Sequence, residues 1–474
     1  MRKKNVLLFI FCLISINYSQ THLPSFFSDN MVLQQNENVS IWGSDNPNVN
    51  ITVSTNWGWG VQSTTKSDEN GKWKIKIMTP SAGGPYTIMI NGSNEIKLNN
   101  IMIGEVWLCS GQSNMEMPVR GFPNSPVNGS NEVILNSKNS NIRLFHTNRA
   151  ASLTPMEDVN GKWTEAEPKT VAYFSAVAYF FGKKLNDVID VPIGLIVSSW
   201  GGANAETWTD AQTLSQFNEI ELPTELPKYN SRQQSPTLLY NGMINPFVGF
   251  NIKGVIWYQG ESNRHRPEQY KKLFPEMIKG WRKNWGQGDF PFYFVQIAPY
   301  YYKTGVNSTF IRESQLYAMQ TVVYTGMAVA TDIGECDQIH PAEKEKIGNR
   351  LAYWALAKDY GIEGVAFSGP VYKSMEVTED NKITLTFDYA ERGLTTFKQE
   401  LKGFQIAGED KVFYKALTKI KRNGIVFVWS DKVPNPVAVR YAFDNCVDAN
   451  LFNVAGLPAS SFRTDNWDKV KKSE

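Results

Sequence analysis

Histidine and cysteine are scarce in this chain, with four of each among 474 residues. Because none of them stands at the spacing of zinc ligands, we expect neither a metal site nor a bound cofactor. No long run of like charge stands out and the formal charge is only +2, which argues against nucleic acid and against an anionic membrane as partners. The 42% hydrophobic content is enough for a sizeable core, and the length predicts a globular protein of about three domains.

The first residues form a pattern of their own. Basic residues at positions 2–4 precede the apolar run Val6–Ile16, and the small residue Ser19 follows it. This is the pattern of a secretory signal peptide, and the run is too short to span a bilayer. Cys12 lies inside the run rather than after it, which argues against a lipoprotein anchor. We therefore predict that residues 1–19 are removed and that the mature chain, with a formal charge near −1, is secreted or periplasmic.

Removal of that segment would leave three cysteines, Cys109, Cys336 and Cys446. An odd number excludes a framework in which every cysteine is paired. Cys109 and Cys336 each lie within a few residues of a candidate catalytic residue, so a bridge between them is one alternative. We expect free buried thiols instead.

Hydrophobic patterning divides the rest of the chain into β, α/β and β regions. Residues 20–100 contain short alternating runs separated by turns, which is typical of a small β-sandwich. Residues 101–362 alternate apolar strands with amphipathic helices, and residues 363–474 return to a β-rich pattern. The expected outer strands are Val39–Trp42, Ile51–Ser54, Trp73–Ile77 and Tyr86–Ile90 in the first region, and Ile383–Phe387, Gly424–Trp429 and Ala438–Tyr441 in the last.

The central region predicts a doubly wound, five-stranded parallel sheet, because its strands alternate with helices. The expected strands are Glu105–Cys109, Gly194–Ser198, Gly254–Tyr258, Phe292–Ile297 and Met327–Asp332, and the expected helices are Val171–Val188, Glu268–Trp285 and Phe310–Tyr324. A further helix is expected to begin at Pro341, since proline is favoured at a first helical position.

Three motifs in this region combine into a catalytic hypothesis: Ser110–Met115 (S-G-Q-S-N-M), Gln259–Asn263 (Q-G-E-S-N) and Asp337–Pro341 (D-Q-I-H-P). Each follows an apolar run, and the carboxyl ends of parallel strands are where such folds bind substrates. Ser113 would be the nucleophile, with His340 as its base and Asp337 orienting that base. The arrangement predicts a serine esterase.

Two alternatives concern the base and its partner. His265 follows the second motif, but it lies between two arginines, whose charge lowers imidazole basicity. We therefore favour His340. Asp332, at the end of the preceding strand, competes with Asp337 as the orienting carboxylate.

The motifs resemble those of the sialate O-acetylesterase family, which includes bacterial carbohydrate acetylesterases and belongs to the SGNH hydrolase superfamily. The resemblance extends over nearly the whole mature chain. It is carried by the three motifs together with Phe27–Gln34, Ala82–Tyr86, Gly104–Cys109, Trp200–Gly202, Val439–Tyr441 and Gly456–Ser460.

The resemblance implies Ser113, Asp337 and His340 as catalytic residues and an SGNH-like fold. It places the second block of the superfamily on Trp200–Gly202, so that Gly202, or Gly201 one residue earlier, would face the oxyanion together with the Ser113 N–H. The third block departs from the usual Gly-x-Asn-Asp. We predict that the Gln259 amide replaces the missing asparagine as a donor, with Asn263 as the weaker option, since an ionised Glu261 would repel an oxyanion.

The implied substrate is an O-acetylated sugar or glycan, first of all a sialic acid, with acetylated xylan or another plant polysaccharide as the alternative. The expected substrate-binding residues are Trp200, Glu261, Asn263 and Asn241, and Trp208, Trp257 and Tyr258 are further aromatic candidates. Arg232, Arg264 and Arg266 could bind a sialate carboxylate or lie in a solvated loop. Two other classes, an inactive carbohydrate-binding protein and a glycoside hydrolase pairing Glu261 with Asp210, leave the serine and histidine without a role. The oligomeric state stays open.

Overall fold

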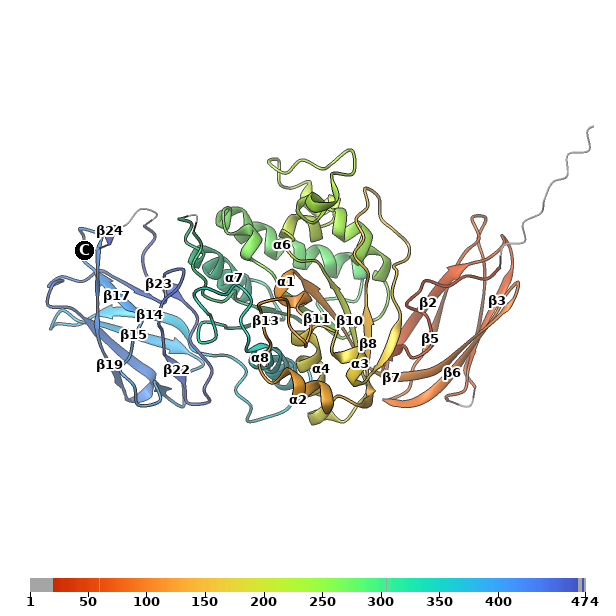
Figure 1. The fold of residues 1–474 in the computed structure, drawn as a ribbon, viewed down its shortest axis with the longest axis horizontal. Helices are drawn as coiled ribbons and strands as arrows, with labels where there is room; N and C mark the ends of the chain where they lie inside the picture. Colours follow the sequence, from red (N-terminus) through yellow and green to blue (C-terminus); the bar gives the residue numbers. More distant parts are fainter. Residues whose placement is uncertain (1–19, 59, 304, 468–470, 473–474) are drawn as a thin grey trace, which may run out of the picture.

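The computed structural model describes residues 20–58, 60–303, 305–467 and 471–472. The predicted signal peptide lies outside the described residues. The chain forms three parts in a row, with β-rich parts at the two ends and a mixed α/β part between them (Figure 1). None of the helices formed by the described residues is both long and apolar enough to cross a bilayer. Within the same residues, no cluster of three or more His, Cys, Asp or Glu side chains could hold a metal ion.

Alternating buried and exposed residues build the first β part. In β5 every second side chain is buried, and this strand pairs antiparallel with β2. A second layer pairs β4 with β3, and β3 with β6. The strands are β1 (Val32–Gln34), β2 (Asn38–Ser44), β3 (Asn50–Thr55), β4 (Gln62–Lys66), β5 (Lys72–Met78) and β6 (Gly83–Asn91).

One long strand, β7 (Glu95–Gly111), joins this part to the α/β part. Its first half pairs antiparallel with β6, and its second half pairs in parallel with β10 and β11. The expected boundary at residue 100 therefore falls inside a strand. Because one strand belongs to both parts, β6, β10 and β11 are all hydrogen bonded to the backbone of β7.

The central sheet has the order β13-β12-β11-β7-β10-β8-β9, in which every neighbouring pair but β8–β9 is parallel. The five expected strands are present, but among the described residues β8 is a sixth parallel strand, so the predicted number was too low. The apolar pattern of β8 is broken by Arg143, which is 1% exposed and donates to backbone carbonyls of Asn30, Asn100 and Ser140. The remaining strands are β8 (Asn139–His146), β9 (Trp163–Ala166), β10 (Ile193–Ser199), β11 (Gly254–Tyr258), β12 (Phe292–Val295) and β13 (Thr325–Ala328).

Helices cover both faces of this sheet, since successive residues of β7 enter different cores. Trp107 packs in the core that contains α4 (Ala176–Ile189) and α8 (Lys344–Lys358). Leu108 packs in the core that contains α6 (Pro267–Trp285) and α7 (Thr309–Thr321). The expected start of this helix at Pro341 was wrong, because α8 begins three residues later, at Lys344. Ala342 N donates a hydrogen bond to the Glu335 side chain and so belongs to the preceding loop. The shorter helices are α1 (Ser113–Glu116), α2 (Ser130–Leu135), α3 (Pro168–Val171), η1 (Ala205–Trp208), α5 (Ala211–Leu214), η2 (Tyr229–Gln234), η3 (Tyr240–Ile244), η4 (Asn245–Phe247), η5 (Glu261–Asn263) and η6 (Arg422–Gly424).

The last β part is a sandwich of two sheets, ordered β14-β15-β20-β19 and β23-β21-β17-β18-β24. Leu385 and Val426 of the first sheet share one core with Ile406 and Val439 of the second. A short β16–β22 pair lies beside them. The strands are β14 (Val371–Val377), β15 (Ile383–Asp388), β16 (Leu394–Thr395), β17 (Phe404–Ala407), β18 (Val412–Lys415), β19 (Leu417–Lys421), β20 (Ile425–Trp429), β21 (Ala438–Tyr441), β22 (Phe452–Asn453), β23 (Phe462–Arg463) and β24 (Lys471–Lys472).

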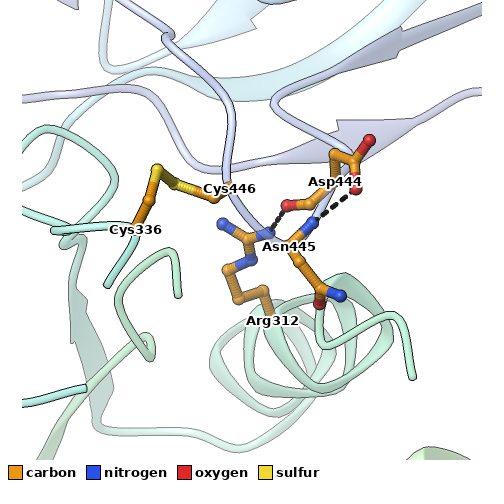
Figure 2. Close-up of a disulfide and its surroundings, with 5 residues drawn as sticks. All are labelled: Arg312, Cys336, Asp444, Asn445 and Cys446. Carbon is orange, nitrogen blue, oxygen red and sulfur yellow. Dashed lines mark hydrogen bonds between the residues drawn. A yellow bond between two sulfur atoms is a disulfide. The ribbon is translucent and has the colours of Figure 1, made fainter. Parts of the chain in front are cut away.

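A disulfide joins this sandwich to the α/β part, between Cys336 and Cys446 (Figure 2). The expectation of free thiols was therefore wrong for these two residues, and the alternative Cys109–Cys336 bridge was wrong as well. Cys109 is a buried free thiol in β7. The partner could not be identified from the sequence because the two cysteines are 110 residues apart and meet only when the domains pack.

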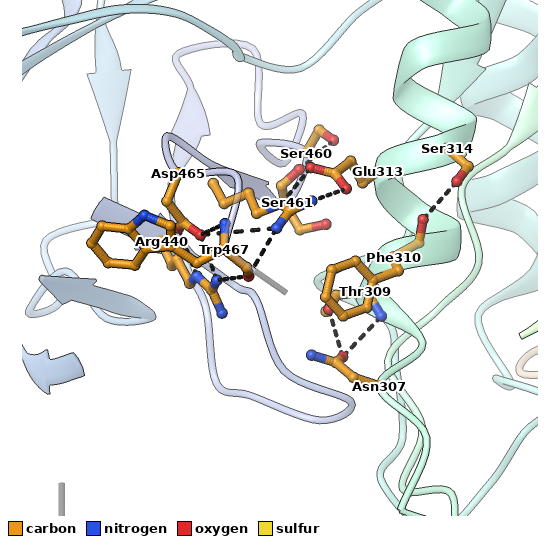
Figure 3. Close-up of polar contacts among 11 residues, drawn as sticks. Asn307, Thr309, Phe310, Glu313, Ser314, Arg440, Ser460, Ser461, Asp465 and Trp467 are labelled. Atoms are coloured by element: carbon orange, nitrogen blue, oxygen red, sulfur yellow. Dashed lines mark hydrogen bonds and ion pairs between the residues drawn. The ribbon is translucent and has the colours of Figure 1, made fainter. Parts of the chain in front are cut away.

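Charged contacts reinforce the same junction. Arg312 of α7 donates to the backbone carbonyl of Asp444 (Figure 2). Arg463 forms two hydrogen bonds with Glu313 of α7. Beside them Arg440 and Asp465 form a buried ion pair (Figure 3). The C-terminal sandwich is thus held directly against α7 and against the loop that contains His340.

Candidate active site

The turn after β7 presents Ser113 at the carboxyl edge of the sheet. Gly111 has a φ of +138°, and a side chain there would collide with the Tyr258 carbonyl of β11, so only glycine fits. Gln112 N donates to that same carbonyl at 2.9 Å. Ser113 then begins α1 and is half-buried. The close approach of β7 and β11 therefore places the half-buried Ser113 at the carboxyl edge of the sheet.

The loop after β10 lies against this serine. Trp200 N donates to the Gly111 carbonyl at 3.2 Å, and a Cβ added to Gly201 would lie 3.4 Å from the Ser113 Cβ. Gly202 follows with a φ of +77°, and the nearest atom to an added Cβ there is 3.8 Å away. A reacting carbonyl near Ser113 would therefore lie beside the backbone of this loop.

Only one of the two glycines has a free N–H. Gly201 N donates to the Glu116 carboxylate at 2.8 Å, whereas none of the described residues accepts a hydrogen bond from Gly202 N. Glu116 also forms two hydrogen bonds with Arg149, at 2.6 and 2.8 Å. These two residues were not predicted from the sequence, although Glu116 lies three positions after Ser113.

The Gln259 amide does not face the serine, which corrects its predicted role as oxyanion donor. Its Nε2 donates to the Ala203 carbonyl at 3.1 Å and to Asn263 Oδ1 at 2.7 Å, so both hydrogens are used. The side chain is fully buried. Gln259 instead holds the loop that carries Gly202.

Asn263, the weaker donor candidate, has a similar structural role. Its Oδ1 accepts from Ala205 N at 2.9 Å, and its Nδ2 donates to Glu206 at 2.9 Å. Because Asn263 is fully buried, it does not reach a bound sugar directly. The second motif, Gln259–Asn263, is thus joined to the loop after β10 by hydrogen bonds between side chains and backbone.

Glu261 lies in a buried polar network rather than at the surface. Asn114 Nδ2 donates to Glu261 at 2.7 Å, and Lys344 Nζ donates to Asn114 Oδ1 at 2.5 Å. Burial raises the pKa of the Glu261 carboxyl and lowers the pKa of the Lys344 ammonium to about 7. Asn114 and Lys344 were not predicted as site residues, although Asn114 lies in the first motif and Lys344 lies three residues after the third.

The loop with His340 is bound to the helix with Ser113. Asn114 Nδ2 donates to the Ile339 carbonyl at 3.1 Å, so the neighbours of Ser113 and His340 are hydrogen bonded. The His340 ring packs edge-on against Phe122 at 5.4 Å. Burial, with a smaller contribution from the charge of Lys344, lowers the pKa of His340 to about 4. The imidazole is therefore neutral at neutral pH, as a general base requires.

The two candidate carboxylates lie in different surroundings. Asp332 forms two 2.7 Å hydrogen bonds with Arg350 of α8 and is largely buried. Asp337 is exposed, and none of the described residues forms a hydrogen bond or ion pair with it. Within the same residues, no hydrogen bond joins His340 to Ser113 or to Asp337.

Most of the aromatic candidates belong to the core. Trp208, Trp257 and Tyr258 are fully buried and cannot stack on a sugar. Trp200 is 4% exposed but packs at 5.4 Å against Tyr229, which is 54% exposed and was not predicted. Tyr229 is therefore the exposed ring of this pair, and Trp200, which was expected to bind substrate, is buried behind it.

The remaining polar candidates divide between internal contacts and the surface. Asn241 is 4% exposed and donates to the Ser152 carbonyl, which assigns it a packing role instead of the expected substrate contact. Arg266 forms an ion pair with Glu206, and Arg264 donates to the Glu261 carbonyl. Arg232 is half-buried beside the ring of Tyr229, at 5.6 Å.

Asp210, the expected partner of Glu261 in a glycoside hydrolase, caps a helix instead. Its carboxylate accepts hydrogen bonds from the backbone and hydroxyl of Thr213 in α5. Glu261 is 3% exposed and bonded to Asn114. A carboxylate pair open to a sugar is therefore not formed by these two residues.

Comparison with known proteins identifies the family. Residues 103–357, more than half of the chain, match the model of the carbohydrate esterase, sialic acid-specific acetylesterase family. The chain belongs to this family. It is 30% identical to the sialate O-acetylesterase of Mus musculus over 446 residues, covering 81% of each chain, and 30% identical to that of Homo sapiens over 424 residues, covering 81% of this chain and 79% of the human one.

A solved structure agrees with this assignment. The carbohydrate acetylesterase from Xanthomonas citri superposes with a TM-score of 0.86 at 36% identity, covering 94% of this chain and all of that one. The protein is accordingly a carboxylic ester hydrolase that acts on O-acetylated carbohydrate. Its large mixed sheet with additional β-sheet parts is the architecture of that acetylesterase.

Proposed function

We propose that this protein is an exported serine esterase of SGNH-like fold, and that O-acetylated sialic acids are its first substrates. The observation that carries the proposal is the meeting of three loops at one edge of the sheet. Ser113 lies against Gly201, and the residue after Ser113 is hydrogen bonded to the residue before His340. Export is supported by the sequence pattern of residues 1–19 alone.

The reaction follows from this arrangement. His340, neutral at working pH, accepts the Ser113 proton as the hydroxyl oxygen attacks the acetyl carbonyl. The developing oxyanion accepts hydrogen bonds from the N–H groups of Ser113 and Gly202, each worth roughly 3 kcal/mol in the transition state. The protonated imidazole then gives its proton to the departing sugar hydroxyl, and water repeats the sequence on the acetyl-enzyme. Asp337 is proposed to orient His340 during these steps.

The substrate proposal rests on the relatives and on the surface beside the serine. The mouse and human relatives are sialate O-acetylesterases. Tyr229, which is 54% exposed, offers a ring face to a sugar, and Arg232 beside Tyr229 has a guanidinium suited to a carboxylate. Acetylated xylan, which carries no such carboxylate on its xylose units, is the alternative substrate.

The decisive experiment is acetate release from O-acetylated sialic acid and, in parallel, from acetylated xylan. The purified protein should release acetate faster from the sialic acid. Ser113→Ala should release none while its circular dichroism and unfolding midpoint stay unchanged, because a half-buried serine at a turn contributes little packing. Activity near wild type in Ser113→Ala would remove this serine from the mechanism.

A second variant tests the choice of sugar. Arg232→Met should lower kcat/KM on O-acetylated sialic acid by about tenfold and leave the rate on acetylated xylan unchanged. The matched control is Lys228→Met, which removes the same charge from an exposed position nearby. Equal losses on both sugars would exclude carboxylate recognition by Arg232.

A further inference from the structure

Three buried polar side chains meet beneath the proposed active site. Lys344, Asn114 and Glu261 are 0%, 1% and 3% exposed and come from α8, α1 and η5. Lys344 Nζ donates to Asn114 Oδ1 at 2.5 Å, and Asn114 Nδ2 donates to Glu261 at 2.7 Å. Buried charges are costly unless they are paired and hydrogen bonded, so a network of this kind calls for an explanation.

Asn114 connects all three motifs through this network. Besides Lys344 and Glu261, its amide contacts the Ile339 carbonyl at 3.1 Å, so the oxygen and the nitrogen of one side chain serve three partners. Asn114 directly follows Ser113 in the sequence, and Ile339 directly precedes His340. The relative position of nucleophile and base is therefore fixed through one amide, whose oxygen is held by Lys344.

We propose that Lys344 is a positioning residue of the esterase: it orients the Asn114 amide that binds the Ser113 helix to the His340 loop, and its charge acts on His340. The inference deepens the function proposed above and rests on Ser113 and His340 as the reacting pair. The esterase assignment itself does not require any role for Lys344.

The surroundings of Lys344 determine how its charge acts. The acidic groups facing it are Glu261 and Glu335, and the ring of Tyr258 lies 5.6 Å from its Nζ. The two carboxylates raise the Lys344 pKa, but burial has the larger effect and lowers it to about 7. The side chain is therefore charged in mildly acidic solution. A positive charge near His340 disfavours imidazolium and lowers its pKa, in the same direction as the larger effect of burial.

The test compares Lys344→Met with Lys346→Met by the pH dependence of kcat/KM. Lys346 lies on the same turn of α8, but its side chain is 52% exposed and pairs with Glu343. Lys344→Met should lower kcat by roughly ten- to a hundredfold with little change in KM, because Ser113 and His340 are no longer held in a fixed relative position. It should also raise the pH of half-maximal kcat/KM on the acidic side by about one unit. Lys346→Met should change neither.

A second measurement separates this inference from the function itself. The His340 ring is titrated by NMR in Ser113→Ala protein with and without Lys344→Met, which needs no activity. A rise in the His340 pKa supports the inference even if the serine mechanism fails. An unchanged His340 pKa in the folded double variant overturns the charge effect, and wild-type kcat in folded Lys344→Met overturns the positioning role.

Asn114→Ala serves where Lys344→Met does not fold. It removes the connecting amide but leaves the Lys344 charge in place. The kcat should therefore fall, while the pH of half-maximal kcat/KM on the acidic side should stay at its wild-type value. Wild-type kcat in folded Asn114→Ala would overturn the proposal.

Discussion

His340 and Lys344 show how strongly burial alters single residues in this protein. Lys344 is fully buried, and its charge adds to the burial that lowers the pKa of His340 to about 4. Both residues lie in or just after the D-Q-I-H-P motif, but the motif alone does not indicate which atoms are enclosed. The pH dependence of the enzyme follows from this environment.

We expect kcat/KM to rise with pH through one ionisation on the acidic side. Because the base must be neutral and the His340 pKa is lowered to about 4, the rise should be complete well below the ordinary histidine pKa of 6.5. The measurement is the pH profile of kcat/KM with an uncharged aryl acetate. A midpoint near 6.5 would mean that His340 is solvated in the free enzyme, and His340→Ala should remove the ionisation together with nearly all activity.

The two aspartates should differ in what they damage. Asp337→Asn should preserve the fold but lower kcat by orders of magnitude, because an amide favours the wrong imidazole tautomer. Asp332→Asn should lower the free energy of unfolding by about 3 kcal/mol, since it leaves Arg350 buried beside a neutral partner. Activity assays and chemical denaturation of both variants check this. If Asp337→Asn kept wild-type activity and Asp332→Asn folded but was inactive, Asp332 would replace Asp337 as the carboxylate that orients His340.

Among the elements, the loop after β10 depends on the loop after β11. Gln259 donates to the Ala203 carbonyl, and Asn263 accepts from Ala205 N, so the second motif (Gln259–Asn263) fixes the backbone around Gly202. The sequence predicted Gln259 as an oxyanion donor and Asn263 as a substrate-binding residue, but it did not reveal that the amides of both residues face inward. The reason is geometric, because a side chain at a strand end can point along either face of the loop.

We predict that Gln259→Ala lowers kcat and the free energy of unfolding together, the latter by about 1–3 kcal/mol. Asn263→Ala should behave alike. Because Gln259 Nε2 donates to Asn263 Oδ1, the double variant should lose less stability than the two single losses added together. Urea denaturation and steady-state kinetics of the three variants test this. A loss of kcat at unchanged stability, with additive effects, would restore Gln259 as an oxyanion donor.

The whole molecule is held together at both ends of the catalytic part. At one end β7 continues from the first β part into the central sheet. At the other end the Cys336–Cys446 disulfide joins the C-terminal sandwich to the loop that also carries His340, four residues further on. The sandwich therefore contributes to the order of a proposed catalytic loop although it supplies none of the reacting groups.

Loss of this disulfide should affect both stability and rate. Cys446→Ser should lower the free energy of unfolding by about 2–4 kcal/mol, because the bond closes a long loop in the unfolded chain. It should also lower kcat, since the His340 loop loses a fixed point. Calorimetry and kinetics with and without reductant measure both effects. Cys109→Ser is the control, and this variant should lose stability and kcat on reduction as the wild type does. Wild-type stability and kcat in Cys446→Ser would show that the disulfide does not order the His340 loop.

The sequence by itself determined the strands of the catalytic sheet with clear apolar runs, the β-rich ends and the motifs that meet at one sheet edge. These features depend on local hydrophobic period and on turn residues such as Gly111, whose conformation few other residues adopt. Only the tertiary structure decided the cysteine pairing, the sixth parallel strand around buried Arg143, the inward direction of Gln259 and the network of Asn114, Glu261 and Lys344. Each of these features depends on contacts between residues that are far apart in the sequence and meet only in the folded core. A local sequence pattern does not determine such contacts.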